Sequence, residues 1–259
     1  MRKSVISHMF NTNAMKVSPY NKPFNYRTGF GPYIYQAQYL FGGEDAANEI
    51  LEIISEYRNN PIQLIQILSD KINLQYQQNE SYKDTINYLK KYIESTVNIK
   101  NIDIISGGER RDWFFSLLLA QLFNKPHLTI FKNGNMYVND NSHPVTKQNM
   151  TGVRALHITD NLVKAKSFNN AWIPFTKQLG ITITDAVSVF DRCNIGHHIL
   201  EENKINHKAL FSVNSNLFGE FLMEGHINEK QYKLLCLFSL DEQKYRENIN
   251  QIISEIERC

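Results

Sequence analysis

The sequence predicts an α/β protein with a five-stranded parallel sheet, and three observations lead to this fold class. Short apolar runs rich in β-branched and aromatic residues recur after residue 101, each about the length of a strand. Helical segments alternate with these runs, which is typical of βαβ units whose crossover helices cover a parallel sheet. The chain of 259 residues, 42% of them hydrophobic, can bury one sizeable core and needs only one domain.

A small β cap is expected before the sheet. Residues 24–41 are rich in Tyr and Phe and are broken by Gly29 and Gly31, which is typical of short strands around a tight turn. Over residues 44–57, apolar side chains recur at the spacing of one helix face. We expect the cap and this first helix to occupy residues 13–57.

A helical insert is expected next, over residues 58–100. An amphipathic pattern extends over residues 61–93 and is interrupted by polar residues 77–81. This pattern predicts helices whose outer faces are solvated.

The predicted α/β core spans residues 101–213. Strands are expected at residues 102–105, 127–131, 154–159, 183–190 and 208–213, and helices at residues 113–123, 167–179 and 195–203. A helical tail over residues 214–259 follows, and its apolar stripes should pack on the body of the protein. A partner-binding face on this tail is the alternative.

Charge and cysteine usage narrow the function classes. The formal net charge of +2 is too small to argue for a nucleic-acid or membrane surface. Three cysteines, an odd number without metal-ligand spacing, fit a reducing cytosol better than a disulfide framework. No segment has the pattern of a signal peptide or the length of a membrane span. We therefore expect a soluble, cytoplasmic protein with neither a membrane nor a nucleic-acid partner.

The segment 155–167 is the most informative part of the chain. An apolar strand ends near Asp160, and a short loop and a new helix follow. Open α/β sheets bind phosphates and sugars at this position, because backbone N–H groups and a helix N-terminus face the ligand there. The arrangement indicates a phosphorylated sugar as the ligand, and an ordinary βα connection is the alternative.

Four separate motifs, read together, resemble those of type I phosphoribosyltransferases. They are residues 24–29, residues 105–112, the loop after Asp160, and residues 189–192 followed by Gly196. Their order and spacing look most like the orotate phosphoribosyltransferases, and the resemblance covers about residues 13–213. A lone acid and an alanine in the phosphate loop are similar to clostridial-type members.

The resemblance implies a site for phosphoribosyl pyrophosphate. Asp160 and Lys132 are the implied catalytic residues, Asp160 holding the ribose hydroxyls. Pyrophosphate contacts are implied for Gly107, Gly108 and Arg111, where small residues let backbone amides approach an anion. The implied 5-phosphate loop consists of Val163, Lys164, Ala165, Lys166 and Ser167.

Two arginines are implied to orient the base. Arg27 lies at the cap position of a family lysine, and Arg192 would place its guanidinium on a ring carboxylate. Mg²⁺ is expected to arrive bound to the substrate, with no metal held directly by the protein. His197 and His198 are neighbours without metal-ligand spacing. A homodimer is implied, since family members share loops across a two-fold axis.

The sequence also departs from the family pattern. The family usually has two adjacent acids, whereas Thr159 and Asp160 stand here, and Lys164 and Lys166 could supply compensating charge. The family's mobile loop is replaced by residues 132–137, whose Asn-Gly pair predicts a short hairpin.

The implied reaction is transfer of the phosphoribosyl group from phosphoribosyl pyrophosphate to orotate, in pyrimidine nucleotide synthesis. Two alternatives stay open. One is a non-catalytic or repurposed member that acts as a nucleotide sensor, a regulatory subunit or an antiviral effector subunit. The other is a related glycosyl-transfer or nucleosidase enzyme that uses another base.

Overall fold

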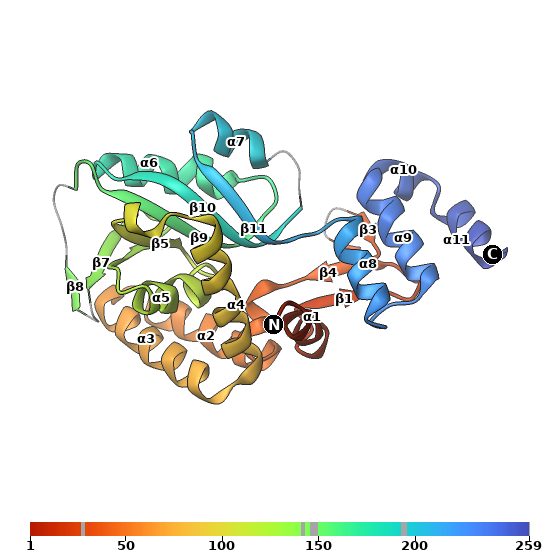
Figure 1. Cartoon of the computed structure of the whole chain (residues 1–259), viewed down its shortest axis with the longest axis horizontal. Helices are drawn as coiled ribbons and strands as arrows, with labels where there is room; N and C mark the ends of the chain where they lie inside the picture. Colours follow the sequence, from red (N-terminus) through yellow and green to blue (C-terminus); the bar gives the residue numbers. More distant parts are fainter. Residues whose placement is uncertain (27–28, 141–142, 146–149, 193–195, 259) are drawn as a thin grey trace.

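The computed structural model describes residues 1–26, 29–140, 143–145, 150–192 and 196–258, and a central sheet dominates it (Figure 1). Within those residues the sheet has seven strands in the order β11-β10-β9-β5-β6-β7-β8. The five strands from β11 to β6 are parallel, and β7 and β8 extend the sheet as antiparallel strands. Their bounds are β5 Ile104–Gly108, β6 His127–Ile130, β7 Met136–Asp140, β8 His143–Val145, β9 Arg154–Leu162, β10 Thr182–Asp191 and β11 Asn206–Ser212.

The predicted parallel core of five strands is confirmed, and a hairpin extends it. The N–H of Phe131 donates to the carbonyl of Asn135 at 2.9 Å, and the N–H of Gly134 donates to the carbonyl of Phe131 at 3.1 Å. Gly134 has a φ of 91°, which glycine adopts readily. This turn joins β6 to β7, as the Asn-Gly pair predicts, whereas the sequence does not predict β8.

Helices cover both faces of the parallel strands because both faces are apolar. Successive residues of one strand enter different clusters, so that Ile104 and Ala155 pack in one and Ile105 and Leu156 in the other. Helix α5 (Trp113–Leu122) covers one face together with the helical insert. A π-helical turn (Phe168–Trp172), α6 (Ile173–Gln178) and α7 (Gly196–Glu202) lie on the other side (Figure 1). This two-sided burial explains the continuous apolar strands.

The helices before the sheet agree with the predicted pattern. They are α2 Glu44–Glu56, α3 Pro61–Gln78 and α4 Glu80–Thr96. The chain breaks between α3 and α4 at Asn79, whose side chain accepts a hydrogen bond from the N–H of Tyr82 at 3.0 Å and so caps α4.

The N-terminal segment contains a helix for which the sequence reading assigns no element. Helix α1 (Arg2–Asn11) buries Val5, Ile6 and Met9 against the rest of the protein. The β cap follows as two small antiparallel pairs, β1 with β4 and β2 with β3. Its elements are β1 Met15–Val17, β2 Phe24–Tyr26, β3 Gly29–Gly31, β4 Tyr33–Tyr35 and a 3-10 turn at Ala37–Phe41.

The tail is helical, as predicted, and it packs beside the β cap (Figure 1). Its helices are α8 Ser215–Met223, α9 Glu229–Leu240, α10 Glu242–Glu247 and α11 Ile249–Arg258. Helix α10 contacts β3, where the Nε–H of Arg246 donates to the carbonyl of Phe30 at 3.0 Å. Among the described residues, no helix combines the length and the apolar character that crossing a membrane requires.

Candidate functional site

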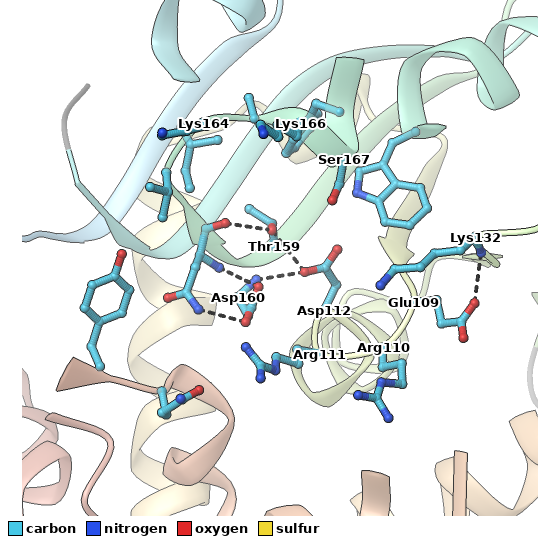
Figure 2. Close-up of a pocket in the computed structure, with 18 residues that line it drawn as sticks. Glu109, Arg110, Arg111, Asp112, Lys132, Thr159, Asp160, Lys164, Lys166 and Ser167 are labelled. Atoms are coloured by element: carbon cyan, nitrogen blue, oxygen red, sulfur yellow. Dashed lines mark hydrogen bonds between the residues drawn. The ribbon is translucent and has the colours of Figure 1, made fainter. Parts of the chain in front are cut away.

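A cavity of about 690 Å³ lies where the parallel strands end. The loop after β5, the end of β9 with its following loop, Lys132, and the cap residues Tyr35 and Gln36 form its walls (Figure 2). Residues far apart in the sequence converge here, because the carboxyl ends of parallel strands share one sheet edge. The predicted site residues in its lining are Arg111, Lys132, Asp160, Val163, Lys164, Ala165, Lys166 and Ser167.

Asp112 joins two walls of this cavity. Its Oδ1 accepts hydrogen bonds from the N–H of Asp160 at 2.9 Å and from the hydroxyl of Thr159 at 3.0 Å. Its Oδ2 accepts the N–H of Gly108 at 3.0 Å. Asp112 is only 5% exposed, so these three donors replace the water that its carboxylate would otherwise need. The start of α5 is thereby fastened to the end of β9, which holds Asp160 in the cavity wall (Figure 2).

Asp160 is a weaker acid than an ordinary aspartic acid side chain. Burial, with a further contribution from the negative charge of Asp112, raises the pKa of Asp160 to about 7, while Arg111 opposes the rise. Its carboxyl oxygens accept the backbone N–H of Asn161 at 2.7 Å and the side-chain amide of Asn161 at 2.8 Å. A cation placed against Asp160 would favour the ionised carboxylate, because opposite charge lowers a carboxyl pKa.

The 163–167 loop lines the cavity and has main-chain donors that are not used elsewhere in the described part of the chain. Among the described residues, the N–H groups of Lys164, Ala165, Lys166 and Ser167 have no hydrogen-bond acceptor. Ala165 has a φ of 46°, in the left-handed region that glycine adopts most readily. A row of unpaired N–H groups ahead of a helical turn is a typical anion site.

Gly196 packs closely against this loop. A Cβ on Gly196 would lie 3.0 Å from the carbonyl oxygen of Val163 and 3.2 Å from the nitrogen of Ala165. A larger residue would therefore displace the loop. The N–H of Gly196 also donates to the carbonyl of Val163 at 3.3 Å.

Positive charge predominates in the cavity lining. Arg110, Arg111, Lys132, Lys164 and Lys166 contribute to the walls. The acids Glu109 and Asp112 are already engaged. The Glu109 carboxylate is 3% exposed, lies 3.2 Å from the Nε of Arg58 and accepts the N–H of Lys132 at 2.9 Å. The remaining cationic groups favour a polyanionic ligand.

Gly107 and Gly108 do not line the cavity. Both lie inside β5, and a Cβ would meet Ser116 Oγ at 2.1 Å from Gly107 and Trp172 at 2.1 Å from Gly108. The N–H of Gly108 is used by Asp112. The close packing of Ser116 and Trp172 explains why glycine is needed at both positions. The resemblance implied instead that these glycines contact pyrophosphate.

Arg192 lies in a second cavity of about 310 Å³. This cavity adjoins the first, because Tyr35 and Gln36 line both. The guanidinium of Arg192 forms an ion pair and a hydrogen bond with Glu242 of α10. Arg27, the other predicted base-binding residue, lies outside the described residues.

One group in the described part of the chain could hold a metal ion. The ligand atoms of Asp191, His197 and His207 lie within 4.8 Å of one another. His197 Nε2 is 2.7 Å from Asp191 Oδ2, and His207 Nε2 is 2.9 Å from the Ser188 hydroxyl. Burial lowers the pKa of His207 to about 4, so its imidazole is neutral at pH 7. The sequence spacing does not reveal this group, because His207 lies on the next strand. The hydrogen bonds of His197 and His207 account for their positions without a metal.

The sequence reading did not assign a site role to Asp112 or to the cap residues Tyr35 and Gln36. An Asp before an apolar helix is usually an N-cap, and only the fold shows that this carboxylate crosses to β9 instead. The resemblance implies a cap residue, Arg27, near the base, but no local pattern indicates that Tyr35 and Gln36 line the cavity.

The sequence matches no protein-family model and no curated protein. Solved structures are nevertheless similar in fold. The UMP synthase of Leishmania donovani is 12% identical with a TM-score of 0.54, over 90% of this chain and 40% of that one. The orotate phosphoribosyltransferase of Aeropyrum pernix is 13% identical with a TM-score of 0.53, over 87% of this chain and 99% of that one. This chain thus spans less than half the length of the first protein and matches nearly all of the second.

Proposed function

We propose, from the premise that this chain has the type I phosphoribosyltransferase fold, that it transfers a phosphoribosyl group from phosphoribosyl pyrophosphate to a base. Orotate is the acceptor that we propose, because Arg192 in the adjoining cavity can bind a ring carboxylate as a bidentate fork.

One observation supports the proposal: Asp160 and the 163–167 loop, whose N–H groups have no acceptor among the described residues, line the same cavity. A ribose 5-phosphate needs a hydrogen-bond acceptor for its hydroxyls and a set of donors for its phosphate oxygens. Lys164 and Lys166 in the same wall add the charge that a dianion requires.

The proposed transfer forms a bond from the ribose anomeric carbon to a ring nitrogen of the base and breaks the bond to pyrophosphate. The nitrogen supplies the electron pair and gives up its proton to the departing pyrophosphate, whose oxygen takes the electrons of the broken bond. Mg²⁺ is part of the substrate in this scheme.

The protein's contribution is positioning and electrostatic stabilisation. Asp160 would orient the ribose, and Arg111 and Lys132 would stabilise the charge that develops on the departing pyrophosphate. Arg192 would orient the base. Positively charged groups that already line the cavity do not have to be brought there at the moment of reaction.

A second candidate is a binding protein without turnover. The observation that favours it is the tight β6–β7 turn, which puts a hairpin where the family has a loop that closes over the substrate. Such a protein would sense phosphoribosyl pyrophosphate or a nucleotide in the same cavity.

Both candidates are tested by incubating the purified protein with phosphoribosyl pyrophosphate, Mg²⁺ and orotate and following the loss of orotate absorbance. We expect turnover by the wild-type protein and at least a hundredfold lower kcat/KM for Asp160→Asn. Binding of phosphoribosyl pyrophosphate without turnover would favour the sensor, and turnover with another base only would overturn the orotate assignment. Absence of phosphoribosyl pyrophosphate binding would contradict the transferase, and absence of nucleotide binding as well would contradict the sensor.

We further propose that the protein is cytoplasmic and forms a homodimer. Sedimentation velocity tests the dimer directly, because a chain of 30.2 kDa would sediment as a species of about twice that mass. A single monomeric species at micromolar concentration would contradict it.

A further inference from the structure

The tail supplies a carboxylate to the arginine of the second cavity. Glu242, the first residue of α10, pairs with Arg192. One turn later, Arg246 Nη1 lies 3.6 Å from the other carboxylate oxygen of Glu242. Glu242 is therefore shared between two guanidinium groups. The pair with Arg192 is only partly exposed, with 26% of the Arg192 side chain accessible.

The same cavity has the shape and chemistry of a site for a flat ring. Tyr26, Tyr33 and Phe238 form aromatic walls around Arg192. The ring of Phe238 is held edge-on against Tyr33, with centroids 5.6 Å apart. Aromatic side chains can pack on the faces of a planar heterocycle. Among the described residues that line this cavity, Arg192 supplies the positive charge for an acidic group on the ring.

We propose that Glu242 is an internal competitor that occupies Arg192 until the carboxylate of the acceptor base displaces it. This inference rests on the proposed function, since it assumes that Arg192 receives an acidic ring. A guanidinium binds a carboxylate through a bidentate edge, and a second carboxylate brought to the same edge meets like charge.

Arg246 makes the exchange feasible. Because Glu242 already lies near Arg246, it keeps a cationic partner when it leaves Arg192. Arg246 is itself anchored to the β cap through the carbonyl of Phe30. The tail can therefore stay docked while one carboxylate replaces another, and the population with Arg192 accessible sets the apparent affinity for the acceptor.

The test is calorimetric titration of orotate, and of uracil as a ring without the carboxylate, into the full-length protein. Glu242→Gln keeps the side-chain shape and removes the competing charge. Glu247→Gln on the same helix is the matched control, because its partner is Gln243 rather than an arginine of the cavity. Glu242→Ala is a second variant without the carboxylate, for use if Glu242→Gln folds poorly. Thermal melting shows whether each variant is folded.

We expect orotate to bind Glu242→Gln at least tenfold more tightly than the wild type, with uracil and the Glu247→Gln control changed less than twofold. Equal orotate affinity in the wild type and both Glu242 variants would overturn the inference, as would an equal gain for uracil. Titration of Mg²⁺–phosphoribosyl pyrophosphate into the same samples separates the two proposals. If phosphoribosyl pyrophosphate binds but the Glu242 variants bind orotate no more tightly, only the inference about Glu242 is wrong. If the Glu242 variants bind orotate more tightly but phosphoribosyl pyrophosphate does not bind, only the proposed transferase activity is wrong.

Discussion

At the scale of single residues, Asp160 links the site to the pH dependence of stability. Its folded-state pKa of about 7 lies above the usual value near 4 for an unfolded chain, so the folded protein holds a proton that the unfolded chain has released. This contribution to stability is full below about pH 4 and is lost as pH rises through about 7. We expect the free energy of unfolding to fall less between pH 5 and pH 7 in Asp160→Asn, by about 1 to 2 kcal/mol after discounting for partial exposure.

Urea denaturation of both proteins at pH 5 and pH 7 measures this difference. Two histidines act in the opposite direction, because burial lowers the pKa of His127 to about 3 and of His207 to about 4. Their contribution is lost as pH falls below about 6.5. They are present in both proteins, so their effect cancels. An identical pH dependence in the two proteins would mean that Asp160 is ionised throughout.

Replacing Asp112 should lower the free energy of unfolding more than replacing Thr159, one of its hydrogen-bond donors. An asparagine has a single acceptor oxygen, so Asp112→Asn would turn an N–H group toward one of the three donors that the carboxylate satisfies. We expect a loss of about 2 to 3 kcal/mol in the free energy of unfolding. Thr159→Val removes one of those donors and is the matched control, with a loss of about 1 kcal/mol. Equal losses in chemical denaturation would contradict the bridging role of Asp112.

Single residues also show where sequence reasoning stops. Asp160, Lys164 and Lys166 come at or after the end of a recognisable apolar strand, so the sequence alone predicts that they lie at the sheet edge. The hydrogen-bond partners of Asp112 cannot be predicted from the sequence, because they depend on how α5 packs against β9. No local pattern encodes that packing.

At the scale of elements, glycines of β5 set how closely the helices approach the sheet. Gly108→Ala would place a Cβ 2.1 Å from the Trp172 ring, and we expect a loss of about 3 kcal/mol or more in stability. Gly219→Ala is the matched control, since no atom lies within 4 Å of its Cβ position inside α8. Alanine there should raise stability by up to about 1 kcal/mol. Thermal melting of both variants checks the pair, and a tolerated Gly108→Ala would show that Trp172 can move.

The parallel strands were predictable because burial on both faces makes each one a continuous apolar run. Helix α1 was not assigned, since only Val5, Ile6 and Met9 mark its buried side in an otherwise polar segment. The tail helices were expected from their apolar stripes, yet the docking of α10 beside Arg192 depends on tertiary contacts far apart in the chain.

At the scale of the whole molecule, Arg2 connects the N-terminal helix to two distant segments, α8 and β11. Its guanidinium pairs with Glu220 of α8 at 2.7 Å, donates to the carbonyl of Leu210, and lies 4.7 Å from the centroid of the Phe211 ring. The hydrogen bond to Glu220 raises the pKa of Arg2, so the charge persists at every accessible pH. We expect Arg2→Ala to cost about 1 to 2 kcal/mol in chemical denaturation, and an unchanged midpoint would contradict this role.

The claim on which the account depends is that the 163–167 loop binds the phosphate of phosphoribosyl pyrophosphate. Calorimetric titration of Mg²⁺–phosphoribosyl pyrophosphate into the wild type and into a Lys164→Gln, Lys166→Gln double variant tests it most directly. Lys177→Gln is the control, because Lys177 is exposed on α6 and contacts Asn203 outside the cavity. We expect phosphoribosyl pyrophosphate to bind the double variant at least tenfold more weakly than the wild type and to bind the control with unchanged affinity. No measurable binding by the wild type, or equal affinity in all three proteins, would contradict it.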